Sequence, residues 1–394
     1  MTAEQLQTLE FLLRNGGTYD LAPNAGSDVF DGIDAFLARF VAYPDQHARH
    51  AHVLWIAHCW FMDCWDTTPR LAFISPEPAS GKTRALTLTR YLVPHPDHTA
   101  DLTPAYLYHS IDAQKKLNGG RPTMLYDELD TVFGQGARYE RMRRVIDAGH
   151  EKGGTVNRLM GKRGAVKFSV FAAMAMAGKM DIYDLPPTIR TRSVVVRMQR
   201  RAPGEEVERW NRRTGPPELE KLRDLLQFWA ELVHDHAATS NFPVLPDMIQ
   251  DRDADVWEPL IAVADLAAGH WPETARVAAV AAVAAVGNKA APSRGMRLLG
   301  DIRAVFDKCG VSVMFTARLL TELRSLEESP WTGLTPMVMA KLLVGYGVEP
   351  KSLRIREQVA RGYEKAAFAE AWRRYLPPQP ATAATAATDG PSDE

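Results

Sequence analysis

The sequence contains few cysteines and no large excess of charge of either sign. Only three of its 394 residues are cysteine, Cys59, Cys64 and Cys309, and their spacing matches no zinc-binding motif. A chain of this size needs no disulfide framework, so we expect buried thiols in a reducing cytosol. The formal net charge of −1 excludes a uniformly basic nucleic-acid coat, although local basic patches remain compatible with it.

The sequence also lacks the hydrophobic runs expected of a membrane or secreted protein. The apolar stretch Val277–Val286 is short and rich in Ala and Val, whereas a membrane span needs about 20 apolar residues. The first residues, MTAEQLQTLEFLLRNGG, are polar and acidic, unlike a secretion signal. We therefore expect a soluble cytoplasmic protein without a membrane partner, located in the bacterial host cytoplasm if a phage encodes it.

Short apolar segments alternate with helical segments between Arg70 and Gln199. Strands without polar alternation, separated by helices, are typical of a parallel sheet that is covered on both faces. The strands are predicted at residues 71–75, 123–128, 168–177 and 193–198. The predicted domains are an N-terminal helical region (1–66), this α/β core (67–215), a helical domain (216–291), a winged-helix-like module (295–376) and a disordered low-complexity tail (377–394).

The winged-helix prediction depends on the order of elements after a proline-containing boundary at 290–294. The module is expected to contain helices at 296–308, 316–327 and 335–345, strands at 311–315, 352–356 and 362–368, and a final helix to Arg374. This order of helices and strands is that of a winged helix-turn-helix.

A strand, a loop and a helix start follow one another in RLAFISPEPASGKTRALTL, residues 70–88. Backbone N–H groups at a helix start attract anions, so Gly81, Lys82 and Thr83 are typical of a phosphate-binding (Walker A) loop. Lys82 is expected to reach the β- and γ-phosphates, and the Thr83 hydroxyl to coordinate Mg²⁺. Pro76 stands where the pattern has its first glycine. The predicted nucleotide-binding residues are Pro78, Ala79, Ser80, Gly81, Lys82, Thr83 and Arg84.

An acidic pair ends the apolar segment TMLYDELD, residues 123–130. At the end of the strand beside the phosphate loop, Asp127 would hold Mg²⁺ and Glu128 would polarise the attacking water, as in a Walker B motif. The alternative is that the two acids merely begin a solvated loop. A glutamate directly after the aspartate favours an ATPase of the ASCE type (AAA+, helicase or RecA-like) over a small GTPase. Together the two motifs predict an α/β P-loop NTPase fold with ATP and Mg²⁺ as cofactors.

Arginines without an intervening acid occur in LPPTIRTRSVVVRMQRR, residues 185–201. In oligomeric ATPases an arginine before such a strand contacts the γ-phosphate bound to a neighbouring subunit. Arg192 is the first candidate for this catalytic role and Arg190 the second; the alternative is surface arginines paired with scattered carboxylates. Lys179 occupies the position of a γ-phosphate sensor.

Two basic segments are candidates for binding nucleic acid. The segment 155–168 is predicted to form a β-hairpin with its tip at 161–164, and such hairpins bind backbone phosphates through charge. The second is the wing of the C-terminal module, beside its recognition-type helix. The alternatives are a solvated turn for the hairpin and protein contacts for the winged helix. The candidate residues are Arg158, Lys162, Arg163, Lys167, Arg354 and Arg356.

Several of these motifs together resemble an AAA+-like P-loop ATPase domain family of actinobacteria and their phages. The resemblance covers most of residues 45–375 and includes LAFISPEPASGKTRAL, TMLYDELDTVF, LPPTIRTRSVVVRM and RGYEKAAFAEAWRRYL. Members are sometimes fused to primase–polymerase modules, so the resemblance implies an ATPase of DNA replication or mobile-element maintenance. Residue by residue it supports Lys82, Thr83, Asp127, Glu128 and Arg192.

The sequence therefore favours a DNA-stimulated ATPase that forms a ring, expected to be a hexamer, and acts as a phage-type replicative helicase on single-stranded or forked DNA. One alternative is a helicase loader or remodelling ATPase whose partners are replisome proteins. The other is an ATP-gated initiator or partition switch that binds duplex DNA.

Overall fold

The computed structural model describes residues 25–376 except 100–101, 118–119, 132, 134–136, 162–163, 183, 212, 214, 240–241, 288–293 and 327–328. Contacts divide the chain into two compact units, Met1–Ala290 and Ala291–Glu394. Each unit is described separately.

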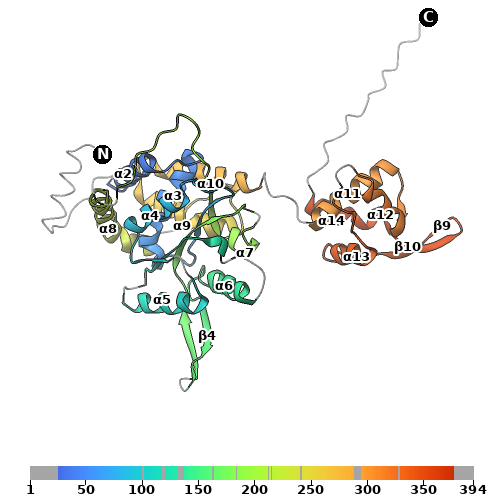
Figure 1. Ribbon diagram of the computed structural model, residues 1–394, viewed down its shortest axis with the longest axis horizontal. Coiled ribbons are helices and arrows are strands. Elements are labelled where there is room, and N and C mark those ends of the chain that lie inside the picture. The colour runs from blue at the N-terminus through green and yellow to red at the C-terminus, as the bar shows by residue number, and fades with distance from the viewer. Residues whose placement is uncertain are drawn as a thin grey trace, which may run out of the picture. The chain divides into compact units, whose positions relative to one another are not determined.

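The first unit is built around a five-stranded sheet in which all neighbouring strands are parallel (Figure 1). The order across the sheet is β2-β3-β6-β1-β7. The strands are β1 (Arg70–Ser75), β2 (Pro96–Thr99), β3 (Thr123–Tyr126), β6 (Ala173–Lys179) and β7 (Ser193–Arg197). Strands β2, β3 and β6 lie on one side of β1, and β7 lies on the other. The strand order therefore reverses at β1.

Alternate residues of β1 belong to two different hydrophobic cores. Leu71 and Phe73 pack into the larger core, and Ala72 and Ile74 into the smaller one. This alternation follows from the two-residue period of a strand. The smaller core is covered by α5 (Pro104–Leu117) and α6 (Ala137–Ala148), and the larger by α2 (Ala25–Phe40), α3 (Gln46–His58), α4 (Lys82–Leu92), α8 (Pro216–Thr239), α9 (Arg252–Ala267) and α10 (Trp271–Gly287).

The helices that the sequence assigned to separate N-terminal and helical domains share this larger core with the sheet. Phe30 of α2 contacts Trp229 of α8 and Trp271 of α10 edge to face, with ring centroids 5.1 and 5.3 Å apart. Such aromatic pairs contribute about 0.5–1.5 kcal/mol each beyond their buried area. Long-range aromatic packing therefore joins segments that composition and spacing had separated.

Local structure differs from the sequence prediction in three places. The strand predicted at 168–177 is two strands, β5 (Ala165–Ser169) and β6, separated by a turn. The split has a clear reason: β5 pairs antiparallel with β4 (Thr155–Leu159), whereas β6 enters the parallel sheet, so the chain must change direction. The strand predicted at 123–128 ends at Tyr126. The polar edge strand β2 and the helix α5 were not predicted.

The described residues of the second unit form a three-stranded antiparallel sheet and four α-helices. Its strands β8 (Val313–Phe315), β9 (Lys351–Ile355) and β10 (Gln358–Glu364) have the order β8-β10-β9. Its helices are α11 (Arg294–Cys309), α12 (Thr316–Arg324), α13 (Pro336–Val344) and α14 (Ala369–Tyr375). The strand predicted at 362–368 begins earlier and ends in a 3₁₀ turn, Lys365–Phe368. No helix within the described ranges is long and apolar enough to cross a membrane.

Candidate functional site

The loop between β1 and α4 lies at the carboxyl end of β1, where the strand order reverses. Ligands of parallel α/β sheets bind at this kind of edge. Gly81 is the N-cap of α4 in a left-handed conformation (φ 86°), and no side chain caps the helix. The first-turn N–H groups of a helix have no intrahelical acceptor, so those of α4 can bind an anion. Ser75 closes the loop, since its Oγ accepts a hydrogen bond of 3.2 Å from the Glu77 N–H.

Lys82 begins α4, and its side chain folds back over the loop. Its ammonium donates to the Glu77 carbonyl oxygen at 3.1 Å and to Ser80 Oγ at 2.9 Å. Burial lowers the pKa of Lys82, and the negative charges of Asp127 and Asp130 act in the opposite direction. A phosphate group could replace the two loop acceptors without moving the ammonium away from these carboxylates.

Asp127 and Glu128 lie at the same edge of the sheet, directly after β3. This strand does not neighbour β1. The sequence placed Asp127 beside the phosphate loop strand; in the structure β6 pairs with both β1 and β3 and separates them. Two strand spacings put the ends of β1 and β3 about 10 Å apart, which leaves room for phosphates and an ion. Asp127 Oδ1 accepts a hydrogen bond of 3.0 Å from the N–H of Glu128, which has a left-handed backbone (φ 66°). Glu128 itself is exposed.

Gly178 permits the turn after β3 to cross the end of β6. A Cβ at this position would lie 2.6 Å from Leu129 Cβ and 3.1 Å from the Asp130 nitrogen. Asp130 Oδ1 accepts a hydrogen bond of 3.0 Å from the Lys179 N–H. Lys179, the proposed sensor, is therefore adjacent to the acidic turn, and its register partner on β1 is Ser75.

The remaining predicted nucleotide-binding residues surround Lys82. Ser80 is buried, whereas Pro78, Ala79 and Thr83 are exposed. Ala79 has a left-handed backbone with φ 61°. Arg84 is half-buried, and burial together with the charge of Arg201 lowers its pKa.

Sequence reasoning gave no role to Arg200, which contacts this loop. Its Nε donates to the Pro78 carbonyl oxygen at 3.0 Å, and its Nη2 lies 3.5 Å from Glu77 Oε2. The only sequence signal was its membership of a basic segment, because the contact joins residues 122 positions apart. Arg200 therefore fixes the loop from the end of β7.

Arg192 lies at the opposite edge of the sheet from Lys82. It directly precedes Ser193, which is in register with Arg70, the first residue of β1. The six residues of β1 span roughly 17 Å, so Arg192 cannot reach the loop of its own chain. Its Nη1 donates to the Thr188 carbonyl oxygen at 2.9 Å and lies 4.0 Å from Asp147 Oδ1.

Arg190 is in the short helix α7 (Pro187–Arg190) and is also not grouped with the loop residues. Its Nη1 lies 3.5 Å from the Ile182 carbonyl oxygen. The structure thus brings together Lys82, Asp127 and Asp130, and leaves both arginines outside this group.

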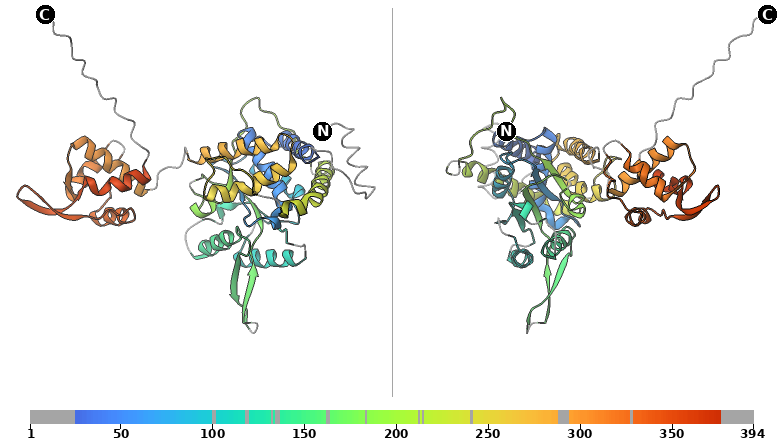
Figure 2. Two further views of the ribbon diagram at one scale, coloured as in Figure 1. Left: turned by 180° about the vertical axis from the view of Figure 1, so that it is seen from behind. Right: turned by 45° about the vertical axis from the view of Figure 1, so that its right-hand side comes forward.

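The predicted basic hairpin is present as β4 and β5, and it projects beyond α5 and α6 in every view (Figures 1 and 2). Lys167 is exposed on it, in register with the exposed Asn157 of the paired strand. Arg158 is half-buried, and its guanidinium stands over the Tyr108 ring at 5.1 Å, so part of its charge is used within the fold. Lys162 and Arg163 lie outside the described residues.

The strand pair β9–β10 of the second unit exposes both predicted arginines. Arg354 lies on β9 opposite Val359, and Arg356 is in the turn with φ 56°. The exposed face of α13 is different in character: it carries Met337, which is 81% exposed, and Val344, with Lys341 as its cation. The surface of this unit is thus basic on the strand pair and largely apolar on α13.

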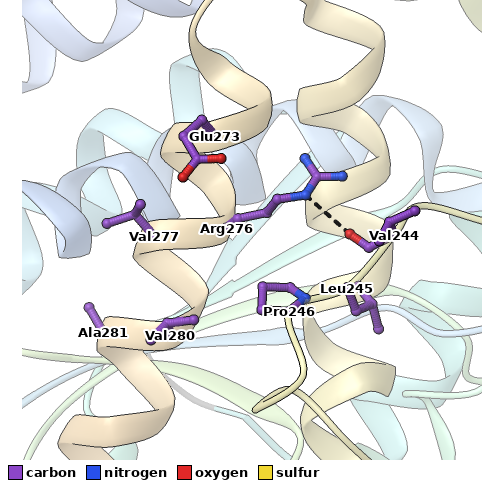
Figure 3. A pocket seen from close by; sticks show the side chains of 8 residues that line it. All are labelled: Val244, Leu245, Pro246, Glu273, Arg276, Val277, Val280 and Ala281. Atoms are coloured by element: carbon purple, nitrogen blue, oxygen red, sulfur yellow. Dashed lines mark hydrogen bonds between the residues drawn. The ribbon is translucent and has the colours of Figure 1, made fainter.

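A separate groove of about 510 Å³ lies between α10 and residues 244–246 (Figure 3). Its lining is mainly aliphatic. Its Arg276 is bound to the Val244 carbonyl oxygen at 3.1 Å and to Asp265 at 2.7 Å. None of the lining residues belongs to the β1–α4 loop, so the groove is not part of the site described above.

Fold and site define the class: an α/β protein whose helix N-terminus, lysine and acidic turn meet at the carboxyl edge of a parallel sheet. A family model described as "Protein of unknown function (DUF3631)" matches residues 197–375. A Saccharopolyspora erythraea protein, "Uncharacterized 28.9 kDa protein in xis 5'region", is 38% identical over 194 residues, which are 46% of this chain and 70% of the relative. The chain belongs to the same family as this Saccharopolyspora erythraea protein.

Two solved structures are similar at low scores. The apo C-terminal region of NrS-1 is 10% identical with a TM-score of 0.40, over 89% of this chain and 77% of that one. The Drosophila ORC bound to DNA is 14% identical with a TM-score of 0.20, over 95% of this chain and 94% of that one. Neither score supports an argument about this chain.

Proposed function

We propose that this protein is a P-loop ATPase of the ASCE, AAA+-like type that hydrolyses ATP with Mg²⁺. One observation carries the proposal: the Lys82 ammonium lies at an uncapped helix N-terminus and interacts electrostatically with Asp127 and Asp130. The helix start and Lys82 would bind the phosphates, Thr83 and Asp127 would hold Mg²⁺, and Glu128 would orient the attacking water. The position of β6 between β1 and β3 supports this class, in which an additional strand separates the two motif strands.

The energy of hydrolysis would be used on DNA. The projecting hairpin presents Lys167 to solvent, and a cationic element of this kind binds backbone phosphates without reading sequence. Since Arg192 cannot act in its own chain, it would complete the site of a neighbour, which requires a ring; we expect a hexamer. In this proposal the protein is a phage-type replicative helicase.

The loader or remodelling function remains the second candidate because of α13. In a winged helix this helix would face DNA, and its exposed Met337 and Val344 suit an apolar protein partner better than a phosphate backbone.

The exposed arginines of β9–β10 favour duplex binding, as an ATP-gated switch would need. A forked-duplex unwinding assay separates these functions, since only the helicase releases the strand.

ATP turnover tests the enzymatic proposal directly. Lys82→Ala should abolish both nucleotide binding and hydrolysis, because it removes the cation that neutralises the phosphates. Glu128→Gln should keep nucleotide binding and lower kcat by about 10²–10⁴-fold, the usual contribution of a positioned base. Lys116→Ala on α5 is the matched control and should behave as wild type. Normal turnover in Lys82→Ala would refute the proposal.

A further inference from the structure

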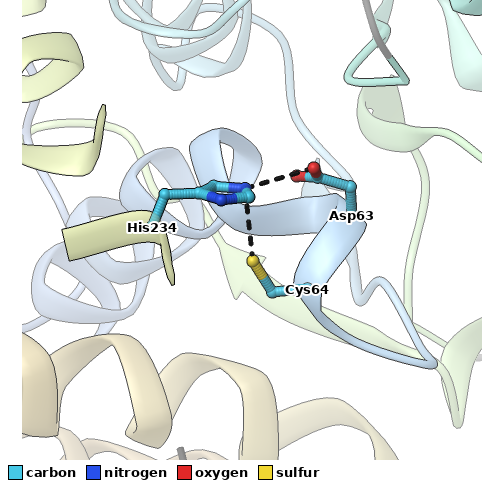
Figure 4. A group of neighbouring side chains, drawn as sticks. All are labelled: Asp63, Cys64 and His234. Carbon is cyan, nitrogen blue, oxygen red and sulfur yellow. Dashed lines mark hydrogen bonds and ion pairs between the residues drawn. The ribbon is translucent and has the colours of Figure 1, made fainter. Parts of the chain in front are cut away.

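The side chains of Asp63, Cys64 and His234, all with metal-ligating atoms, converge between the 3₁₀ helix η1 (Cys59–Cys64) and α8 (Figure 4). Cys64 and His234 are 170 positions apart in the sequence. Asp63 Oδ2 lies 3.1 Å from His234 Nε2, and Cys64 Sγ lies 3.4 Å from the same nitrogen. The three ligand atoms are all within 4.8 Å of one another. Local sequence patterns did not identify this cluster, because Cys64 and His234 are so far apart in the chain.

A single ring nitrogen of His234 serves two partners in this cluster. A histidine nitrogen offers either one proton or one lone pair, yet Asp63 and Cys64 both face Nε2. A Cys-His-Asp relay would instead place its two partners on different ring nitrogens. A shared cation would satisfy all three atoms at once.

The two distances that involve His234 fit edges of a tetrahedral zinc site. Zinc bonds of about 2.0–2.1 Å to nitrogen and oxygen and 2.3 Å to sulfur predict N···O edges of about 3.3 Å and N···S edges of about 3.5 Å. The observed 3.1 and 3.4 Å are close to these values. The donor set also selects the metal, since a thiolate with an imidazole favours Zn²⁺ over Mg²⁺ or Ca²⁺.

Neighbouring groups hold the ligands in place. Arg121 Nε donates to the other carboxylate oxygen, Asp63 Oδ1, at 2.9 Å, which leaves Oδ2 directed at the cluster. Lys152 Nζ donates to the Asp63 carbonyl oxygen at 2.9 Å. The Phe61 ring stacks on the His234 ring with an interplanar angle of 13°. Such supporting contacts orient the ligands of protein metal sites.

We propose that Asp63, Cys64 and His234 bind one Zn²⁺ ion, with water as the fourth ligand, and that this ion fastens α8 to η1. The side chains of Asp63 and His234 are 30% and 23% exposed, so water can reach the fourth position. Through Arg121 and Lys152 the site also touches the segments that precede β3 and β4. The proposal is independent of the ATPase function.

Binding requires the Cys64 thiol to lose its proton to solvent, after which sulfur donates an electron pair to the ion. Burial raises the pKa of Cys64 to about 12, with Asp63 and Asp235 adding to this effect and Arg121 and Lys152 opposing it. Because zinc binds the thiolate form of cysteine, each bound ion should release the thiol proton.

Cobalt titration of the full chain tests the site. The chelator-treated protein, without nucleotide, is titrated with Co²⁺ and should develop a thiolate-to-cobalt charge-transfer band that Zn²⁺ removes. Cys64→Ser should lose the band, whereas the matched control Cys309→Ser should keep it. His234→Gln should weaken Zn²⁺ binding by at least about 10–100-fold, the loss seen for supporting residues alone, and His236→Gln on the same helix should not.

Two further measurements keep the outcome decisive. Zn²⁺ should raise the Tm of the wild type and a chelator should lower it, which holds even if a variant fails to fold. Lys82→Ala should retain the band, so failure of the ATPase proposal would leave this one intact. Absence of the band in the wild type, or its persistence in Cys64→Ser, would overturn the zinc site.

Discussion

At the scale of single residues, the site depends on side chains whose neighbours come from distant segments. Lys82 is held by its own loop, but the carboxylates that oppose its desolvation are on the turn after β3. Gly178 allows that turn to cross β6, since a Cβ would collide with Leu129. Conservative substitutions of Lys82 or Gly178 should therefore change the geometry of the site while the chain still folds.

Buried histidines give a residue-scale prediction about pH. Burial lowers the pKa of His52 and His58 to about 3 and of His150 to about 4, from 6.5. The unfolded chain binds more protons below pH 6.5, so stability is complete above about pH 7.5 and falls as the pH drops toward 4. The free energy of unfolding should decrease by about 2 kcal/mol per histidine between about pH 7.5 and 5.

Urea denaturation at the two pH values measures this loss. Both ring nitrogens of His52 are hydrogen-bonded, Nδ1 with the Tyr43 hydroxyl at 2.7 Å and Nε2 with Thr89 Oγ1 at 2.8 Å. His52→Gln should therefore lower the free energy of unfolding at neutral pH. The same variant should reduce the pH-dependent loss by about 2 kcal/mol, because it removes one titrating group. An unchanged pH-dependent loss would show that His52 is not the group that titrates.

At the scale of elements, the proposed DNA contact is assigned to the β4–β5 hairpin. It extends from the body, and Lys167 is exposed on it (Figure 2). Lys167→Gln should weaken single-stranded DNA binding and reduce the slope of log K against log salt by about 0.7. Fluorescence anisotropy across a salt series measures both.

The matched control is Lys116→Gln on α5, a lysine paired with Asp112 four residues earlier. It removes the same charge from the same unit and should leave the salt slope unchanged. Equal slopes for wild type and Lys167→Gln would show that the hairpin does not contact the backbone.

At the scale of the whole molecule, the separation of Arg192 from Lys82 predicts a shared active site. A mixture of Lys82→Ala, which retains Arg192, and Arg192→Ala, which retains Lys82, should recover ATPase activity that neither variant has alone. The recovery occurs because an intact arginine can face an intact phosphate loop across a subunit interface. Steady-state ATP turnover of the mixed protein measures it.

The control replaces the second partner with a chain that has lost both groups. Lys82→Ala mixed with the double variant Lys82→Ala/Arg192→Ala should stay inactive, since no intact loop is present. If Arg192→Ala is inactive and mixing restores nothing, Arg192 does not act across an interface.

The parallel α/β sheet, and the placement of Lys82 and Asp127 at its carboxyl edge, could be predicted from local patterns. An apolar strand followed by Gly81-Lys82 identifies a helix start that can bind an anion, and the apolar run before Asp127 identifies a strand end. These signals are local, because strand burial and helix capping depend on neighbours in the sequence. The same locality explains the missed elements: β2 is a short polar strand at the sheet edge, paired with β3 alone.

The sequence by itself determined that an apolar strand leads into Gly81-Lys82-Thr83 and that an apolar strand leads into Asp127-Glu128, and hence the chemistry available at the carboxyl edge of the sheet. Only the tertiary structure decided that β6 separates the two motif strands, that Arg192 lies at the far edge, and that Cys64 meets His234. Each of these depends on contacts between segments far apart in the chain, and no periodic pattern encodes such pairing. The scarcity of cysteine excluded a zinc motif of regular spacing, whereas a ligand cluster assembled by folding was still possible.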